Sequence, residues 1–212
     1  EKTFEEVLDE HPVSIQVNGQ WQTFPNARAA EEAAYGEYKD NLRRTAENFR
    51  ITDDHLGEGG PKAKFQANIA AIKLLKYLEE TTEQATPEQQ KILSRYVGWG
   101  GLADAFDPEK PAWAAEYTQL KELLTPEEYT AARGSTLNAH YTSPTVIRAI
   151  YETVGRMGFE TGNILEPSMG VGNFFGMLPE EMRNSRLYGV ELDPISGRIA
   201  KQLYPKADIT VG

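Results

Sequence analysis

The chain has 212 residues, of which 40% are hydrophobic and 25% charged, with a formal net charge of −10 and no cysteine. This composition supports a packed core and excludes wholesale disorder, a disulfide framework and thiolate metal sites. No apolar run approaches the roughly 20 residues of a membrane span, and the start EKTFEEVLDEHP has no apolar signal-peptide region. We therefore expect a cytoplasmic protein that makes no membrane contact.

The first predicted element is a β-hairpin at residues 13–24, VSIQVNGQWQTF. Apolar and polar residues alternate on both sides of Asn18-Gly19, which is a strong hairpin turn signal. An alanine-rich stretch at about 26–48 predicts a helix. Residues 1–47 are interpreted as a linker or docking module.

Residues 48–137 predict a helical region. Pro61 suits the first position of a helix, and apolar residues then recur at spacings of three and four, which indicates one buried face. These residues are Phe65, Ile69, Ile72, Leu75 and Leu78. Two further helix starts, at Thr86-Pro87-Glu88-Gln89 and Thr125-Pro126-Glu127-Glu128, have the pattern of capping boxes.

The stretch YVGWGGLADAF, residues 96–106, is too rich in glycine to be regular structure. We interpret it as a tight turn with Trp99 packed in the core, in preference to a lid over a ligand. Basic residues cluster in two stretches earlier in the sequence. They are Arg43, Arg44, Arg50, Lys62, Lys64, Lys73 and Lys76. Because the chain is acidic overall, solvated helix faces are favoured over a nucleic-acid contact, which stays the alternative.

From residue 138 the pattern changes to alternating strands and helices. Strands are predicted at 163–166, 186–191 and 207–211, and helices between them at 173–178 and 194–204. Short connections between such elements indicate an α/β fold with a parallel, doubly wound sheet. Three strands are fewer than a complete fold of this type needs, so residues 138–212 are predicted to be the N-terminal part of a truncated domain.

A further helix is predicted immediately before the first of these strands. Ser143-Pro144 opens it and Gly158 ends it. Its apolar stripe is Ile147, Ile150, Val154 and Met157. Free N–H groups at its start could meet the carboxylate of a bound amino acid, although Tyr141-Thr142-Ser143-Pro144 taken alone is only a helix cap.

The turn in NILEPSMGVGNFFGML, residues 163–178, carries the chemistry. Glu166 ends a strand and therefore faces the crevice where open α/β sheets bind ligands. Gly170 and Gly172 allow close approach or positive φ. A second strand-end acid, Glu191, follows Gly172 by 191 − 172 = 19 residues, the position expected for a carboxylate that binds ribose hydroxyls.

The residues around the turn favour S-adenosylmethionine (SAM) as the ligand. A dinucleotide motif would place a third glycine where Phe175 stands, and a phosphate-binding P-loop would need Lys-Ser/Thr after Gly172. Glu166 is a poor neighbour for pyrophosphate but suits the sulfonium and ammonium of SAM. A structural glycine pair and a nicotinamide-dependent oxidoreductase remain the alternatives.

Four stretches carry a family resemblance: NFRITDDHLGEGG, LSRYVGWGG, LTPEEYTAARGSTLNAHYTSP and ILEPSMGVGNFFGMLP. Over residues 138–204 the chain resembles N6-adenine DNA methyltransferases in which a Tyr-Thr-x-Pro motif precedes the glycine motif. Over about 48–212 it more closely resembles the methylase segment of the large helicase–methylase proteins of conjugative elements and phages.

The resemblance implies a role for each matching residue of the SAM site. The methionine end would be flanked by Tyr141, Thr142 and Pro144. The amino-acid moiety would be lined by Glu166, Gly170 and Gly172, with Phe174 packed beside it, and Pro167 is also expected to bind the cofactor. The ribose hydroxyls would bind Glu191, and the adenine would lie near Leu192 or Asp193. At position 169 a methionine stands where related motifs carry a small residue, which loosens the expected fit of the turn.

The resemblance also implies catalytic residues that are absent from these 212 residues. The family presents its target adenine with an Asn-Pro-Pro-Tyr or Asn-x-Pro-Phe motif, and this chain has neither. We therefore expect a SAM-binding fragment that is inactive alone, with DNA contacts and a helicase region elsewhere in a larger polypeptide. The alternative is a noncatalytic DNA- or partner-coupling module. No metal site is expected, because His11, His55 and His140 are scattered.

Overall fold

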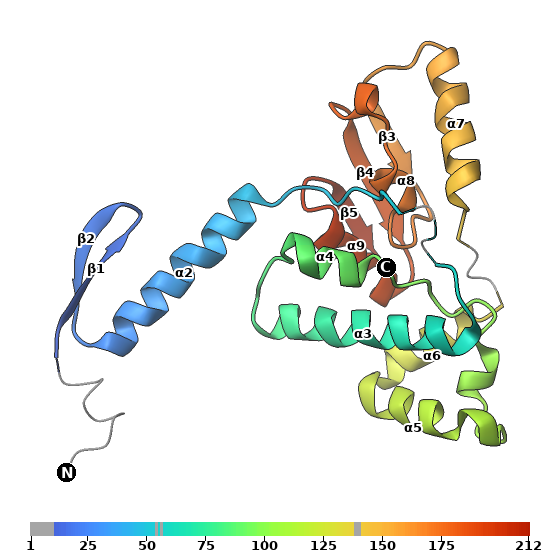
Figure 1. The fold of residues 1–212 in the computed structure, drawn as a ribbon, viewed down its shortest axis with the longest axis horizontal. Helices are drawn as coiled ribbons and strands as arrows, with labels where there is room; N and C mark the ends of the chain where they lie inside the picture. The colour runs from blue at the N-terminus through green and yellow to red at the C-terminus, as the bar shows by residue number, and fades with distance from the viewer. Residues whose placement is uncertain (1–10, 54, 56, 138–140) are drawn as a thin grey trace. The chain divides into compact units, whose positions relative to one another are not determined.

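The computed structural model describes residues 11–212 except 54, 56 and 138–140, so His140 lies outside the described residues. The chain forms two compact units, one ending at Ala46 and one spanning Glu47–Gly212. The element order is drawn in Figure 1. In the described part of the chain, no helix combines the length and apolar character needed to cross a bilayer.

The first unit contains the predicted hairpin and one helix. Strands β1 (Val13–Val17) and β2 (Gln20–Phe24) pair antiparallel. The two turn residues between them both have positive φ, 51° and 73°, as a tight two-residue hairpin requires. Helix α2 (Ala27–Thr45) then starts at Asn26, whose side chain accepts a hydrogen bond from the third residue of the helix at 2.8 Å.

Four helices form the first half of the second unit: α3 (Pro61–Glu80), α4 (Pro87–Leu93), α5 (Ala114–Leu123) and α6 (Pro126–Ser135). Both predicted capping boxes are present, at the starts of α4 and α6. Helix α5 was not predicted from the sequence, because Leu120 is its one fully buried side chain and its apolar pattern is weak. Short 3₁₀ turns, η1 (Ala103–Phe106) and η2 (Pro111–Trp113), precede it.

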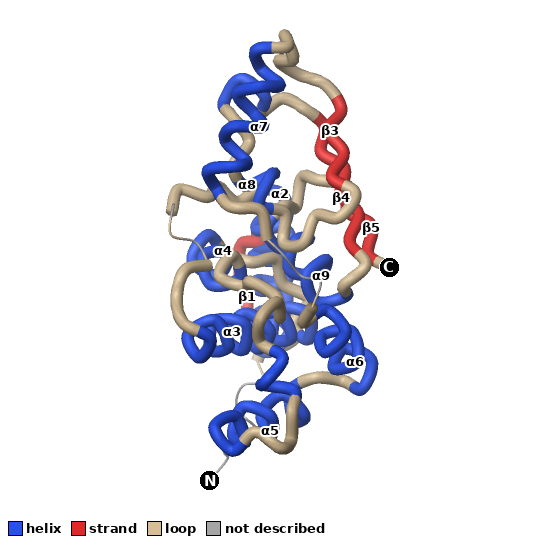
Figure 2. Tube along the Cα trace, turned by 90° about the vertical axis from the view of Figure 1, so that its right-hand side faces the viewer, coloured by secondary structure: helices blue, strands red, loops and turns tan. Residues whose placement is uncertain are grey.

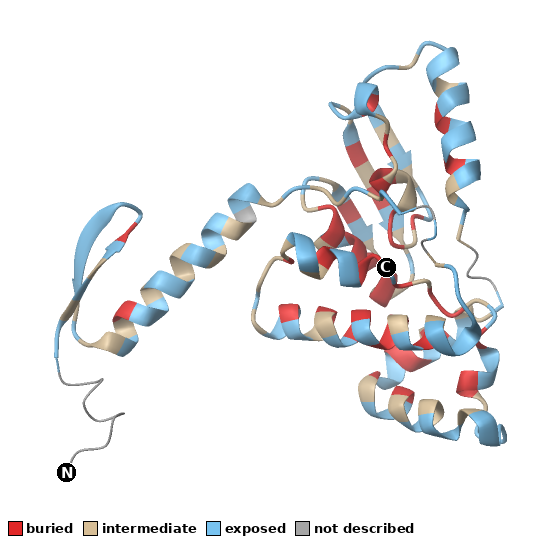
Figure 3. Cartoon of the chain, in the orientation of Figure 1, coloured by how far each residue is buried: buried red, intermediate tan, exposed pale blue. Residues whose placement is uncertain are grey.

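The predicted apolar face of α3 is confirmed, since all five of its residues are buried. They meet the loop that follows α4, in which Trp99 is fully buried against Phe65, Tyr96 and Phe106. Figure 3 shows this buried surface along α3. The interpretation of Trp99 as a core residue is therefore confirmed.

The second half of the unit contains a three-stranded sheet in the order β3-β4-β5. Strands β3 (Asn163–Glu166), β4 (Arg186–Glu191) and β5 (Asp208–Val211) are all parallel. The helical elements are α7 (Pro144–Arg156), α8 (Asn173–Gly176), η3 (Glu180–Met182) and α9 (Pro194–Leu203). The mixed α/β class and the strand positions are thus confirmed.

Helices cover one face of this sheet in the part of the chain that is described. In Figure 2, α7, α8 and α9 lie on the same side of the strands. On the opposite face, Leu165 and Val190 are 62% and 37% exposed. The predicted stripe of α7 is only partly correct: Ile147 is buried, but Ile150 and Met157 are 42% and 81% exposed.

Candidate functional site

A pocket of about 580 Å³ lies at the carboxyl ends of β3 and β4. Glu166 is the last residue of β3 and Glu191 the last of β4. Parallel strands end at the same edge of a sheet, and the register places both acids on its helix-covered face. Two acids that are 25 residues apart in the sequence therefore line one cavity, called here the two-carboxylate pocket.

The glycine turn connects β3 to α8 and forms one wall of this pocket. Gly170 and Gly172 have φ values of 56° and 82°, the left-handed region that glycine adopts without strain. A Cβ at position 170 would lie 3.0 Å from the ring of Tyr141. The first glycine is thus needed because the Tyr141 ring packs directly on the turn.

The second glycine of the turn meets the protein interior. A Cβ on Gly172 would lie 2.5 Å from the Tyr204 ring. The Met169 side chain is buried beneath the turn, where a Cβ on Gly189 would lie 2.2 Å from its sulfur. Glycine at 189 therefore makes room for Met169, and the loose fit expected at this position does not occur.

Glu191 holds the turn in place and keeps capacity to bind a ligand. Its Oε2 accepts a hydrogen bond from the Gly170 N–H at 2.6 Å, and its Oε1 accepts one from the Asp193 N–H at 2.8 Å. A carboxylate has about four lone-pair sites. One acceptor site on each oxygen therefore remains for a ligand with two adjacent donors.

The Glu166 carboxyl group is partly buried and has an unusual pKa. Burial, and secondarily the nearby Glu191 carboxylate, raise the pKa of Glu166 to about 8. Its Oε2 is buried and has no hydrogen-bond partner among the described residues. Buried polar atoms are rarely left unpaired, and a ligand that brings a hydrogen-bond donor would satisfy this oxygen.

Eight of the eleven predicted cofactor-binding residues line the two-carboxylate pocket. They are Tyr141, Thr142, Glu166, Gly170, Phe174, Glu191, Leu192 and Asp193. Among the described residues, Pro144 lines instead an adjacent cavity of about 530 Å³, Pro167 lies on an apolar groove beside α7, and Gly172 packs on Tyr204. The structure therefore brings together the acids and the aromatic residues, but not these three.

Several lining residues were not predicted from the sequence. Tyr96 and Gly98 come from the loop after α4, and Ala131, Gly134 and Ser135 come from α6. Others adjoin the predicted motifs: Ser168, Met169, Asn173 and Ser196. The last group could have been found by including the neighbours of each motif residue. The first group carries no local signal, because only the packing of the helical half brings it to the sheet.

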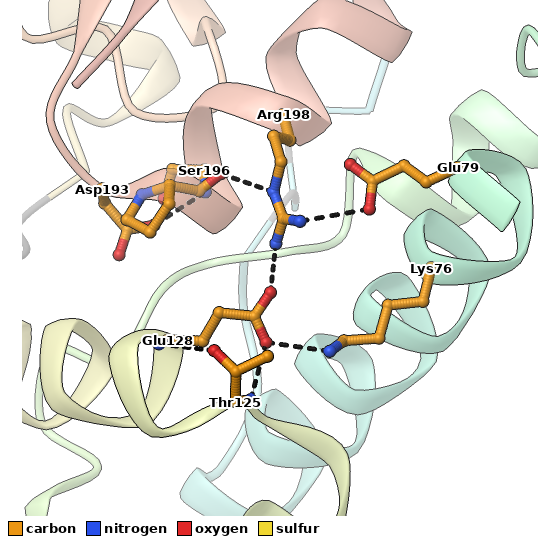
Figure 4. A network of polar contacts seen from close by, with 8 residues as sticks. Lys76, Glu79, Thr125, Glu128, Asp193, Ser196 and Arg198 are labelled. Carbon is orange, nitrogen blue, oxygen red and sulfur yellow. Dashed lines mark hydrogen bonds and ion pairs between the residues drawn. The ribbon is translucent and has the colours of Figure 1, made fainter. Parts of the chain in front are cut away.

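A network of charged residues fixes this packing (Figure 4). Glu128, the capping-box residue of α6, accepts a hydrogen bond from Lys76 of α3 at 2.8 Å and is ion-paired with Arg198 of α9. Arg198 also contacts Glu79 at 3.1 Å. Burial alone would raise the pKa of Glu128, but the hydrogen bonds from Lys76, the Thr125 backbone and Arg198 lower it. The network thus joins α3 to α6 and α9, two helices that carry residues of the pocket.

Comparison with known proteins gives two partial similarities. The chain is 25% identical over 155 residues to Defense against restriction protein B of Escherichia phage P1, covering 73% of this chain and 5% of that protein. It is 42% identical over 52 residues to the type II methyltransferase M.CvrRI of Paramecium bursaria Chlorella virus XZ-6E, covering 24% of this chain and 13% of that protein. The chain therefore spans a small fraction of each relative. No protein-family model and no solved structure matches it.

Proposed function

We propose that residues 47–212 bind SAM in the two-carboxylate pocket, as the cofactor-binding part of a DNA adenine-N6 methyltransferase within a larger helicase–methylase polypeptide. The observation that carries this proposal is the buried, unpartnered Oε2 of Glu166, which shares a pocket with the strand-end carboxylate of Glu191. Similarity to a protein named as a methyltransferase supports it.

The residues of the pocket fit SAM in charge. Two carboxylates in one cavity disfavour an anionic ligand and favour a cationic one. SAM carries an ammonium and a sulfonium, and its ammonium supplies the donors that Glu166 lacks. Binding of this cation would ionise Glu166, which in the free protein has its pKa raised to about 8. The cavity volume of about 580 Å³ is within the range of small-molecule sites.

The residues also fit SAM in hydrogen bonding. The remaining acceptor sites of Glu191 match the vicinal diol of a ribose. The neighbouring Leu192 and Asp193 follow it into the same cavity, where we assign the adenine. Because the backbone N–H groups of Gly170 and Asp193 fix the carboxylate of Glu191, little ordering would be needed on binding.

A dinucleotide fits this pocket less well. Phe175, at the position of the third glycine of a dinucleotide motif, is 2% exposed and packs edge-on against Tyr204. A pyrophosphate beside Glu166 would place negative charges together in a partly buried site. We therefore assign the pocket to SAM in preference to a nicotinamide dinucleotide.

Bound SAM supplies an electrophilic methyl group to a nucleophilic amine. The role of this chain is to hold and orient that group and to shield it from water. Three residues of this chain would do so: Glu191, which is fixed by backbone hydrogen bonds, Glu166, which would pair with the ammonium, and Tyr141, whose ring packs on the turn. Since the 212 residues hold no Asn-Pro-Pro-Tyr or Asn-x-Pro-Phe motif, we expect them to bind SAM without methylating DNA. A Rossmann-like sheet is the fold that we infer around strands β3-β4-β5.

The noncatalytic alternative relies on free basic residues for DNA binding, and several are engaged within the protein. Lys62 donates to the Ala112 carbonyl at 2.6 Å and pairs with Glu116 at 2.7 Å. Lys76 pairs with Glu128 at 2.8 Å. These contacts disfavour a DNA-binding surface built from this cluster.

Calorimetric titration of the chain with SAM, S-adenosylhomocysteine and NAD tests the proposal. We expect SAM and S-adenosylhomocysteine to bind and NAD not to bind. Glu191→Ala should lower the affinity for SAM and for S-adenosylhomocysteine by about tenfold or more, because each ribose hydroxyl loses a charged acceptor. Glu160→Gln, an exposed change outside the pocket, is the matched control. Binding of NAD alone, or of no ligand by folded protein, would refute the proposal.

A further inference from the structure

The loop with the sequence Tyr-Val-Gly-Trp-Gly-Gly, residues 96–101, is held rigidly at both its side chains and its backbone. Trp99 is fully buried, with its ring centroid 5.2 Å from that of Phe106. Asn68 of α3, also fully buried, donates from Nδ2 to the Gly98 carbonyl at 2.6 Å and accepts from the Val97 N–H at 2.9 Å. A loop fixed in this way cannot act as a moving lid. It instead presents its first residue, Tyr96, in a defined position.

Tyr96 carries a buried hydroxyl and is one of the residues that line the two-carboxylate pocket. The residue is 1% exposed and lines both this pocket and the adjacent cavity. By distance and angle its hydroxyl has no hydrogen-bond partner among the described residues, although Ser196 and the Trp99 indole lie close to it. Burial dominates and keeps the pKa well above its ordinary value, so the phenol stays protonated and remains a donor.

The surroundings of this hydroxyl identify the end of the pocket that it serves. The Asp193 carboxylate and Tyr141 both lie close enough to Tyr96 to raise the pKa of its hydroxyl further. Asp193 and Ser196 both belong to the start of α9, two and five residues beyond the ribose-binding acid Glu191. Tyr96 therefore belongs to the Asp193 end of the pocket, whereas Glu166 stands at the end of β3.

The unpaired Tyr96 hydroxyl would destabilise the fold if no ligand accepted its hydrogen bond. Tyrosine hydroxyls that are buried normally find a partner, and an unsatisfied buried donor loses its hydration without compensation. Purine ring nitrogens and ribose oxygens are acceptors of the kind that a phenol can satisfy. The same rigid loop that makes Trp99 a core residue thus positions a ready donor beside the nucleoside end of the cavity.

We propose that Tyr96 is a ligand-binding residue that donates a hydrogen bond to the nucleoside end of the bound cofactor. The helical half of the unit is then part of the binding site, and the loop of residues 96–101 positions the Tyr96 hydroxyl in it. The inference rests on the proposed function, because the nucleoside is the one that SAM would bring.

The test is calorimetry with two ligands, S-adenosylhomocysteine and 5′-methylthioadenosine, which share the nucleoside and differ in the amino-acid moiety. Tyr96→Phe removes the hydroxyl and keeps the ring, so the melting temperature should not fall. We expect affinity for both ligands to fall by the same factor, about tenfold. The matched control is Tyr204→Phe. Tyr204 is equally buried and its hydroxyl equally unpartnered among the described residues, but it does not line the pocket. We expect this control to bind both ligands like the wild type.

Three results would overturn the inference alone: unchanged affinities in Tyr96→Phe, weaker binding of S-adenosylhomocysteine only, or an equal loss in Tyr204→Phe. The second would place the contact at the amino-acid end. If the wild-type chain binds neither ligand, the proposed function fails and this inference fails with it. A tyrosine ring-carbon NMR signal of Tyr96 that moves on addition of 5′-methylthioadenosine would support the contact independently of the variant.

Discussion

Replacing Glu166 with glutamine should change how the stability of the protein depends on pH. Burial and the Glu191 carboxylate raise the pKa of Glu166 from its ordinary 4.5 to about 8 in the folded protein. Between these values the unfolded chain has lost a proton that the folded protein still holds, so unfolding becomes easier as pH rises. The full difference corresponds to about 5 kcal/mol, an upper limit because the residue is only half-buried.

Glu166→Gln cannot ionise and should abolish this part of the pH dependence. From about pH 5 to about pH 8.5, the wild type should lose up to about 4 kcal/mol of unfolding free energy that the variant keeps. Urea unfolding followed by tryptophan fluorescence measures it. A Trp21→Phe background is useful because Trp21 is 72% exposed in the first unit, which leaves the buried Trp99 and the half-buried Trp113 as reporters.

The control for this experiment is Glu160→Gln, which replaces an exposed carboxylate of the same chemistry. It should leave the wild-type pH profile unchanged. Parallel stability profiles for the wild type and Glu166→Gln would show that Glu166 is ionised in the folded protein. The account of this residue as a neutral acid awaiting a cation would then be wrong.

Three further changes test the packing around the pocket. Gly172→Ala should lower the free energy of unfolding by about 3 kcal/mol or more, since the φ of Gly172 is 82° and an added Cβ would lie 2.5 Å from the Tyr204 ring. The control Gly101→Ala, with φ 72° and open space around the Cβ, should lower it by only about 1–2 kcal/mol. Equal losses of stability in urea unfolding would contradict the clash with Tyr204. Asn68→Ala should cost about 2–4 kcal/mol, because the buried Gly98 carbonyl and the partly buried Val97 N–H lose their partner. A loss below about 0.5 kcal/mol would argue against this role of Asn68. Glu128→Gln should cost about 2 kcal/mol at neutral pH. Because the folded pKa of Glu128 is lowered, its stabilisation is complete above about 4.5 and is lost as pH falls further, so a cost that persists in acid would contradict the ion-pair network.

The secondary structure was largely predictable because its signals are local. Asn18-Gly19 and the two Thr-Pro capping boxes act within four residues, and each formed as predicted. The three parallel strands were also predicted closely, since each is a short apolar run between turns. Helix α5 was missed because Leu120 is its one buried residue, which leaves little apolar periodicity in its sequence.

The two acids of the candidate site were predictable for a related reason. A residue that ends a parallel strand must stand at the carboxyl edge of the sheet, so Glu166 and Glu191 had to approach one another once the strands were identified. The direction in which each neighbour points was not predictable. Pro144, Pro167 and Gly172 belong to the same motifs, yet they face an adjacent cavity, an outer groove and the interior.

Sequence alone therefore determined the elements and the pair of carboxylates, because backbone propensities, caps and strand ends act over a few residues. Only the tertiary structure brought Tyr96 and the residues of α6 to the same pocket. Their placement depends on Asn68, on the buried Trp99 and on the Glu128–Arg198 pair, contacts that join residues about 30 to 70 positions apart. Such contacts follow from how side chains pack in three dimensions, and no short-range pattern in the chain encodes them.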